Sequence, residues 1–232
     1  MNLKNAIIIG GSGELGLAIS KFLLLNNYKI IITFKNKNKK KKIEREISNF
    51  KKSYYLKNCD LESEKSIKKT IFFANKHLGD IDLVINAAGV FYYDIINKLN
   101  YSKILSTFKI NALSTIVINK EIKKNKKNKN FTKIISIGSS SSLAGYKDTV
   151  TYCGSKHALS GIVRSLNKTI YKNKIINYCI NTGSLKNKMG RKVKNQNFEK
   201  FIDQKEIIKS IKFLIDINPP AIPEDIFIRR FI

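Results

Sequence analysis

Short apolar runs alternate along the chain with longer segments in which apolar residues recur at helical spacing. Residues 5–11 ("NAIIIGG") and 28–34 ("YKIIITF") are nearly continuous apolar runs, which are typical of buried strands. The segment between them, Glu14 to Asn26, has the length of a helix. This alternation predicts βαβ units around a parallel sheet. It continues with predicted strands over residues 52–60, 81–89, 131–140, 175–183 and 225–232, and with predicted helices up to residue 49 and over residues 63–77, 104–123, 151–172 and 205–217.

No fixed-period repeat appears, and no proline- or glycine-rich linker divides the 232 residues. We therefore expect residues 1–232 to form a single doubly wound α/β domain of the Rossmann type, with a mostly parallel sheet of about seven strands. In such sheets, ligands bind beyond the carboxyl ends of the strands. The residues that follow each predicted strand are therefore the first place to look for chemistry.

The formal net charge of +27 invites a nucleic-acid-binding interpretation. Only five basic residues are arginine, however, and lysine is accompanied throughout by asparagine and isoleucine, as in "KNKNKKKK". These three residue types share A/T-rich codons, so a biased genome produces the pattern without any binding function. Nucleic-acid sites favour arginine forks and aromatic platforms. We therefore interpret the charge as a solvated surface and do not expect a nucleic-acid partner.

Cys59, Cys153 and Cys179 are widely spaced and lack a CxxC pattern. They indicate free thiols in a reducing compartment, with neither disulfides nor a zinc site. The two histidines, His77 and His157, have no cluster of ligands near them in the sequence, so we expect no metal. No apolar run is long enough for a membrane span, and no signal-peptide pattern precedes the first strand. We expect a cytoplasmic protein.

A glycine-rich turn, "GGSGELG", follows the first predicted strand and places Gly10, Gly13 and Gly16 three residues apart. Glycine permits positive φ and the close approach of a pyrophosphate, and the following helix offers free N–H groups at its N-terminus. The turn therefore predicts a dinucleotide-binding site, to which we also assign Ser12 and Leu15.

Small or polar residues follow the other predicted strands as well. Asp60, in "CDL", is placed to accept a hydrogen bond from an adenine amino group; its alternative role is a helix N-cap, for which Ser63 competes. "NAAG" follows the fourth strand and is small enough to pass beneath a cofactor, "GSSSS" follows the fifth, and "NTGSLKNKM" follows the sixth. The cofactor-binding residues assigned to these strand ends are Leu61, Asn86, Ala87, Ala88, Gly89, Thr182, Gly183, Leu185 and Asn187.

The stretch "YCGSK" places Tyr152 and Lys156 four positions apart, and so one turn apart on the same face of a predicted helix. A phenol titrates near ~10, and an ammonium beside it favours the phenolate. The pair is therefore a candidate for an activated proton donor. The ordinary alternative in a lysine-rich chain is an exposed pair without a role.

These motifs together resemble the short-chain dehydrogenase/reductase family over about residues 5–190. That family carries a glycine-rich first turn, an "NNAG"-like stretch, a serine, a Tyr-x-x-x-Lys pair and a "PG" turn. The corresponding features here are "GGSGELG", "NAAG", Ser139, "YCGSK" and "NTGSLKNKM", in the same order. Each match is common alone, but the joint order and spacing are specific. The chain is similar in particular to 3-oxoacyl-thioester reductases.

Three positions depart from the family pattern. Glu14 stands at the usual middle glycine of the first turn, and because a carboxylate near a pyrophosphate is unfavourable, we expect it to point to solvent. Thr182 stands where proline is usual. Asn187 stands where a threonine often contacts the nicotinamide amide, and asparagine still offers both a donor and an acceptor.

The resemblance implies a role for each catalytic residue. Tyr152 would be the general acid/base, and Lys156 would lower the pKa of that phenol and bind the nicotinamide ribose. Ser139 would hydrogen-bond the substrate oxygen. Asn111, in "KINALS", would help to hold a water for proton relay; an ordinary polar helix residue is the alternative. In this interpretation Tyr152 and Lys156 also contact the cofactor.

Charge at the end of the second predicted strand bears on the choice of cofactor. A dinucleotide fold places an acid there for the 2′-OH of NAD, or a basic residue for the 2′-phosphate of NADP. Lys35 lies close to that position in "TFKNKNK", and no acid follows until Glu44. We therefore favour NADP(H) over NAD(H), although Lys35 also fits the lysine-rich background.

The resulting hypothesis is an NADPH-dependent reductase that converts a ketone or aldehyde to an alcohol. A 3-oxoacyl thioester on an acidic acyl carrier protein is one substrate that the resemblance implies, and a ketosugar or nucleotide sugar is an alternative. A non-catalytic dinucleotide-sensing scaffold is a further alternative, against which the complete Ser139, Tyr152 and Lys156 set argues. Residues 184–200 are expected to form a substrate lid. The resemblance also implies a homodimer or homotetramer assembled through the predicted helices near residues 104–123 and 152–172.

Overall fold

Seven parallel strands form one sheet in the part of the chain that the computed structural model describes, residues 4–50, 53–127 and 130–230. Their spatial order is β3-β2-β1-β4-β5-β6-β7. The direction of strand succession reverses between β1 and β4, so their carboxyl ends form a topological switch point. The predicted doubly wound α/β fold class is thereby confirmed. The strands are β1 (Lys4–Ile9), β2 (Tyr28–Phe34), β3 (Tyr54–Asn58), β4 (Leu83–Asn86), β5 (Thr132–Ile137), β6 (Ile175–Thr182) and β7 (Asp225–Ile228).

Isoleucine-rich strands form the centre of the sheet because both of its faces are covered. All residues of β4 and β6 are buried, which is the pattern expected of a parallel sheet packed on both sides. The predicted strands extend beyond the observed ones at their carboxyl ends, where residues such as 87–89 and 138–140 leave the sheet. The last strand was predicted over residues 225–232, but β7 ends at Ile228, and residues 231–232 lie outside the described part of the chain.

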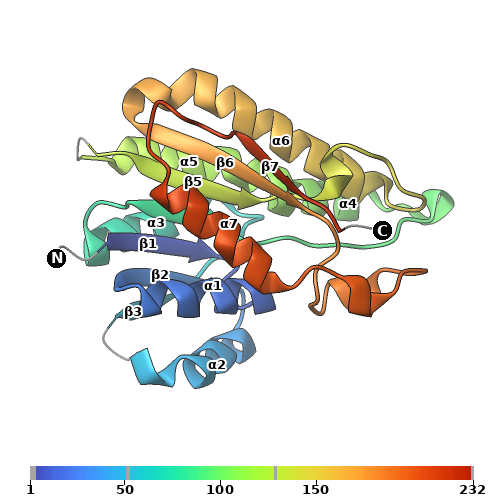
Figure 1. Ribbon diagram of the computed structural model, residues 1–232, viewed down its shortest axis with the longest axis horizontal. Coiled ribbons are helices and arrows are strands. Elements are labelled where there is room, and N and C mark those ends of the chain that lie inside the picture. The colour runs from blue at the N-terminus through green and yellow to red at the C-terminus, as the bar shows by residue number, and fades with distance from the viewer. Residues whose placement is uncertain (1–3, 51–52, 128–129, 231–232) are drawn as a thin grey trace.

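Helices cover the two faces of the sheet in separate groups (Figure 1). On one face α1 and α7 pack against β1, β4 and β6, with α2 against the edge; on the other face lie α3, α5 and α6. None of the helices in the described ranges is long and apolar enough to cross a membrane. The helices are α1 (Glu14–Leu25), α2 (Lys37–Glu46), α3 (Glu64–Leu78), α4 (Tyr101–Phe108), α5 (Ser114–Asn125), α6 (Val150–Ile170) and α7 (Gln204–Asp216), with short 3₁₀ helices at Ser48–Phe50, Ile96–Lys98, Ser140–Ser142, Tyr171–Asn173, Gly190–Lys192 and Phe198–Lys200.

One predicted helix is divided by a change in winding. The single helix expected over residues 104–123 is instead α4, a π-helical turn over Lys109–Leu113, and α5. Within this turn the side chain of Asn111 bonds to the backbone of Val90, outside the helix. Single π turns in α-helices occur frequently at functional sites. The interruption therefore draws attention to the neighbourhood of Asn111.

Candidate active site

A cavity of about 1280 Å³ opens at the carboxyl ends of β1 to β6. It exceeds the ~300–1,000 Å³ typical of a site for one small molecule, and so has room for a dinucleotide and a substrate. Every residue predicted to bind cofactor or to take part in catalysis lines this cavity, except Asn86 and Asn111. The predicted residues that line it are Gly10, Ser12, Gly13, Leu15, Gly16, Lys35, Asp60, Leu61, Ala87, Ala88, Gly89, Ser139, Tyr152, Lys156, Thr182, Gly183, Leu185 and Asn187.

The glycine-rich turn between β1 and α1 has the shape of an anion cradle. Gly10 has a φ of +76°, and a Cβ there would lie 2.6 Å from the nitrogen of Ala88. A Cβ on Gly16 would lie 2.4 Å from the oxygen of Gly10. Gly13 is the N-cap of α1 and no side chain caps the helix, so its N-terminal N–H groups face the cavity unscreened by a cap. The turn therefore fits the pyrophosphate of a dinucleotide.

Glu14, which we expected to point to solvent, instead contacts the segment after β6. Its Oε2 accepts a hydrogen bond of 2.8 Å from the backbone nitrogen of Lys188. Glu14 is partly exposed, and this contact could not be predicted from the first turn of α1 alone, because the fold brings a segment 174 residues away over that turn. Glu14 thus connects the anion cradle to the predicted lid.

Basic side chains gather at the end of the cavity beyond β2 and β3. Lys35 lies there with Lys39 and Lys42 of α2. The Lys35 ammonium is 3.1 Å from Oε2 of Glu62, and the hydrogen bond between them raises the pKa of Lys35. Glu62, Lys39 and Lys42 were not predicted from the sequence, because nothing in a lysine-rich segment distinguishes two of its lysines and Glu62 follows a different strand.

Asp60 lies at the same end of the cavity and does not cap a helix. The side chain that caps α3 is Ser63, which accepts a hydrogen bond from the Ser66 backbone nitrogen. Oδ1 of Asp60 accepts from the backbone nitrogen of Glu62, at 3.1 Å. The carboxylate thus lines the cavity beside Leu61, where it fits the predicted role toward an adenine.

The "NAAG" stretch forms a narrow floor in the middle of the cavity. Asn86 lies beneath this floor, where its amide donates to the hydroxyl of Thr115. A Cβ on Gly89 would lie 3.8 Å from the Lys156 ammonium and 3.5 Å from Oδ1 of Asn111. Gly89 therefore lies close to both Lys156 and Asn111.

Ser139, Tyr152 and Lys156 meet where β5 and α6 border the cavity. Ser139 and Tyr152 are joined by a side-chain hydrogen bond, and the Lys156 ammonium lies 5.9 Å from the centre of the Tyr152 ring. Phe91 packs edge-on against that ring, with their centres 4.9 Å apart. The three polar groups are thus held around one point at the cavity wall.

The electrostatics of this group differ from the expectation. Burial raises the pKa of Tyr152, and the hydrogen bond with Ser139 opposes that rise. Lys156 donates its bond to the carbonyl of Ile137, at 2.8 Å, and not to the phenol. Burial lowers the pKa of Lys156 to about 8. The predicted lowering of the Tyr152 pKa by Lys156 is therefore not what this structure has, because burial outweighs a charge that lies off the phenol oxygen.

Asn111 supports the cavity from behind. Its Oδ1 accepts from the Val90 nitrogen, at 2.9 Å, and its Nδ2 donates to the Val90 carbonyl and to the hydroxyl of Ser155, both at 3.0 Å. These bonds occupy the amide and join the "NAAG" floor to α6, one residue before Lys156. The π turn is thus the element that brings Asn111 to both partners.

The segment after β6 closes one side of the cavity. Oδ1 of Asn187 accepts from the Gly190 nitrogen, so this amide stabilises its own turn. The Lys194 nitrogen donates to the hydroxyl of Tyr93, at 2.7 Å. Tyr93 also packs against Phe91. Neither aromatic residue was predicted, although "FYY" begins only two residues after the end of "NAAG".

Neither histidine belongs to this site. The His157 ring bonds to the Cys153 carbonyl, and the His77 ring to the Phe73 carbonyl. Across the described residues, no three His, Cys, Asp or Glu side chains come together as a metal site would require.

Comparison with known proteins identifies the family of this chain. The model of the short chain dehydrogenase family matches residues 4–197. Carbonyl reductase family member 4 of Xenopus laevis is 26% identical over 222 residues, which cover 92% of this chain and 91% of that protein. The 3-oxoacyl-(acyl-carrier-protein) reductase FabG of Rickettsia typhi is 24% identical over 223 residues, which cover 96% and 86%. The structure of ElxO with NADP bound is similar with a TM-score of 0.89 at 21% identity and covers 98% of both chains. Since the family model spans well over half of its length, the chain belongs to the short-chain dehydrogenase/reductase family of NAD(P)-dependent oxidoreductases.

Proposed function

We propose that this protein is an NADPH-dependent reductase that converts the carbonyl group of a ketone or aldehyde to an alcohol. The observation that carries the proposal is the meeting of Ser139, Tyr152 and Lys156 at one wall of a cavity whose far wall is the glycine-rich turn. That arrangement suits a proton donor beside a reacting oxygen. NADPH, when bound, would supply the hydride.

Each side chain at this wall has a distinct task in the proposed reaction. Tyr152 gives its proton to the carbonyl oxygen of the substrate. Ser139 donates a hydrogen bond to that oxygen and so stabilises the charge that develops there. The Lys156 ammonium, which lies 5.9 Å from the centre of the Tyr152 ring, would hydrogen-bond the hydroxyls of the nicotinamide ribose. Asn111 fixes α6 against the floor of the cavity, and its proposed contribution to proton relay depends on that position.

The residues that would hold the cofactor follow the strand ends in order. The turn from Gly10 to Gly16 takes the pyrophosphate, and the floor from Ala87 to Gly89 lies along the middle of the molecule. Lys35, Lys39 and Lys42 suit a 2′-phosphate at the far end. The structurally similar ElxO has NADP bound, which supports NADP(H) over NAD(H) in this chain as well.

The proposed substrate is a 3-oxoacyl thioester carried on an acidic acyl carrier protein. Two kinds of support favour it: the FabG relative is a reductase of that substrate by name, and Lys147, Lys194 and Arg230 line the cavity, where they suit an anionic carrier or substrate. The same cations suit a ketosugar bearing a phosphate, which is the second candidate. Residues 184–200 would close over the substrate as a lid, within a single domain.

Assembly and location complete the proposal. Tyr101, Leu105 and Ile116 are exposed on α4 and α5, which suits a homodimer or homotetramer formed through these helices and α6. The three cysteines are free and buried, which suits the reducing cytoplasm.

The test is to follow NADPH absorbance with acetoacetyl-coenzyme A, a 3-oxoacyl thioester, and with ketosugar phosphates. We expect turnover with the thioester, and a loss of about 10²- to 10⁴-fold in kcat for Tyr152→Phe with NADPH binding retained. A wild-type protein that binds NADPH but reduces none of these carbonyl compounds would contradict the reductase proposal and favour the sensing scaffold.

A further inference from the structure

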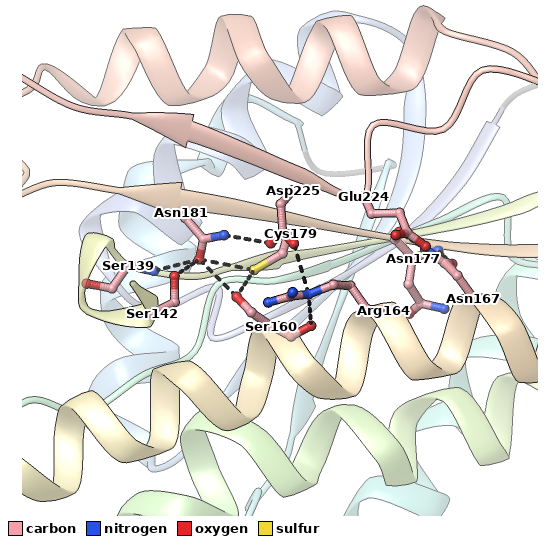
Figure 2. A network of polar contacts seen from close by, with 10 residues as sticks. All are labelled: Ser139, Ser142, Ser160, Arg164, Asn167, Asn177, Cys179, Asn181, Glu224 and Asp225. Carbon is pink, nitrogen blue, oxygen red and sulfur yellow. Dashed lines mark hydrogen bonds and ion pairs between the residues drawn. The ribbon is translucent and has the colours of Figure 1, made fainter. Parts of the chain in front are cut away.

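A buried polar network lies directly behind the candidate catalytic serine (Figure 2). At its centre is Asn181, a fully buried residue on β6. Its Oδ1 accepts a 2.9 Å hydrogen bond from the hydroxyl of Ser142 and a 3.3 Å bond from the backbone nitrogen of Ser139. Its Nδ2 donates to Oδ1 of Asp225, at 2.7 Å. One side chain therefore connects residues 138–142, which we call the serine loop, to the last strand of the sheet.

The surroundings allow only one orientation of the Asn181 amide. Donors converge on its oxygen, since the hydroxyl of Ser160 and the thiol of Cys179 also approach Oδ1 at 3.4 Å. A carboxylate that only accepts faces its nitrogen. Reversing the amide would place its NH₂ group against the backbone N–H of Ser139 and its oxygen against the carboxylate of Asp225. The oxygen is thus held toward the serine loop.

The network is anchored at its far end by charge. Asp225 lies 3.3 Å from Nε of Arg164 on α6, and the Arg164 Nε also donates to the carbonyl of Ser160. Asp225 is mostly buried, so its orientation is constrained by packing and by a charged partner. The position of Asn181 is consequently set by two elements, β7 and α6, that lie outside the catalytic loop.

The serine loop is fitted closely around this amide. A Cβ on Gly138 would lie 2.1 Å from Oδ1 of Asn181 and 2.7 Å from the sulfur of Cys179. The loop backbone therefore passes directly over the amide, one residue before Ser139. Ser139 also makes its own local contact, because its hydroxyl accepts from the Ser141 nitrogen at 3.1 Å. Both the backbone and the side chain of Ser139 depend on the shape of this loop.

We propose that Asn181 is a positioning residue for the reductase, one that holds the backbone of Ser139 so that its hydroxyl points to the reacting carbonyl oxygen. This inference rests on the proposed function for its catalytic half, and on the hydrogen bonds of the loop for its structural half. An error of about 1 Å in the position of a reacting group can cost ~10²-fold in rate. Loss of the Asn181 bonds loosens the loop without removing the Ser139 hydroxyl.

The chain offers a matched control on the same strand. Asn177 is also an asparagine of β6, is fully buried, and lies on the same face four residues earlier. Its Nδ2 and Oδ1 have no hydrogen-bond partner among the described residues. Asn177→Ala therefore removes a buried amide of the same size from β6 without touching the serine loop. Figure 2 shows Asn177 apart from Asn181, Ser139 and Ser142.

The first experiment measures steady-state reduction of acetoacetyl-coenzyme A by full-length variants. We expect Asn181→Ala to lower kcat about 10-fold with NADPH affinity unchanged, and Asn177→Ala to leave kcat within about 2-fold. In a Ser139→Ala background, which itself costs about 100-fold or more, adding Asn181→Ala should cost nothing further in kcat. Additive losses in that cycle would show that Asn181 does not act through Ser139 and would overturn the proposal.

A swapped pair guards against a variant that merely unfolds. Asn181→Asp combined with Asp225→Asn keeps an acceptor toward Ser139 and Ser142, and restores an amide donor between the two positions. We expect this double variant to recover most of the activity that Asn181→Ala loses. An equal loss in both variants, with melting temperatures close to that of the wild type, would contradict the proposal.

Hydrogen exchange separates failure of this inference from failure of the proposed function. We expect Asn181→Ala to speed amide exchange in the peptide covering residues 137–143 by about 10-fold, and Asn177→Ala to leave it unchanged. If the wild type reduces no carbonyl probe, the reductase proposal fails, and this exchange result alone decides whether Asn181 holds the loop. Unchanged exchange in Asn181→Ala would overturn the inference whatever the enzyme assay shows.

Discussion

The carboxylate of Glu62 lies 3.1 Å from the ammonium of Lys35, although the two residues follow different strands. Lys35 follows β2 and lines the end of the cavity where a 2′-phosphate would lie, whereas its partner Glu62 follows β3. Hydrogen bonds from Ser106 and Lys35 lower the pKa of Glu62, so it carries its negative charge at neutral pH. The same acid that pairs with Lys35 therefore opposes a phosphate that Lys35 would bind.

Replacing Glu62 with glutamine should strengthen the binding of NADPH. The substitution keeps the size of the side chain but removes the competing charge, so Lys35 becomes free to pair with the 2′-phosphate. We expect the Kd for NADPH to fall about 3- to 5-fold at low salt and the Kd for NADH to stay unchanged, by nucleotide fluorescence titration. Lys35→Ala should raise the Kd for NADPH and leave the Kd for NADH unchanged.

Glu64→Gln is the control for this effect. Glu64 is also an acid paired with a lysine, Lys120, but it does not line the cavity. An equal gain in NADPH affinity in both glutamine variants would show that total charge, and not the Lys35 pair, is responsible.

Glu14→Gln should strengthen the binding of NADPH and NADH equally. Both cofactors carry the pyrophosphate, and the carboxylate of Glu14 stands in the first turn of the helix that would receive it. Glutamine retains an oxygen that can accept from the Lys188 nitrogen, so the connection to residues 184–200 survives. We expect a 2- to 5-fold lower Kd, at about 50 mM salt, that largely disappears at 1 M salt. If the Kd fell for NADPH alone, Glu14 would act on the 2′-phosphate and not on the pyrophosphate, which would contradict this prediction.

Lys156→Met should stabilise the cofactor-free protein at neutral pH while abolishing reduction. Burial lowers the pKa of Lys156 from 10.5 to about 8, which corresponds to about 3 kcal/mol of destabilisation. The Ile137 carbonyl loses its hydrogen-bond donor in the variant, which lowers the free energy of unfolding by about 1 to 2 kcal/mol. We therefore expect a net gain of about 1 to 2 kcal/mol in the free energy of urea unfolding at pH 7.

The gain should reverse sign with pH. Below pH 8 the Lys156 ammonium is charged in both the folded and the unfolded chain, so the full cost of burying the charge applies. Between pH 8 and 10.5 only the unfolded chain keeps the proton, so the stability of the wild type rises with pH. Near pH 10.5 the methionine variant should be the less stable of the two. Lys168→Met, at an exposed position on the same helix, should show no such crossing. A gain that persists at pH 10.5 would mean that packing and not charge causes it.

Ser139→Ala should move the pH profile of the reverse reaction, alcohol oxidation, to higher pH. Oxidation needs the deprotonated phenol, and the Ser139 hydrogen bond lowers the pKa of Tyr152. Without that bond the pKa of Tyr152 rises, so the acid limb of the kcat profile shifts to more alkaline pH in addition to the loss of rate. Ser140→Ala, a neighbour that also lines the cavity, should leave the midpoint in place.

The sequence was a good guide wherever local pattern decides structure. Runs such as "AIIIG" and "KIIITF" mark buried parallel strands because isoleucine covers both faces of the sheet. The glycine spacing and the Tyr152–Lys156 spacing lie within single turns, so their geometry follows from the helix and the turn alone.

The features that the sequence did not reveal depend on contacts between distant segments. Glu14 meets Lys188 and Glu62 meets Lys35 only after the sheet has assembled. The apolar spacing continues through the π turn, so the sequence predicts an ordinary helix there, whereas the hydrogen bonds between Asn111 and Val90 join residues 21 positions apart. The Tyr152 pKa departed from expectation because burial depth has no local signature in the chain.

The close fit between Gly138 and Asn181 has a consequence for anyone redesigning this pocket. Because a methyl group at position 138 would overlap the amide oxygen at position 181, the two sites cannot be randomised independently. A combinatorial library that enlarges residue 138 must shrink residue 181 in the same clone. Screens that vary one position at a time would discard substitutions that are workable only as a pair.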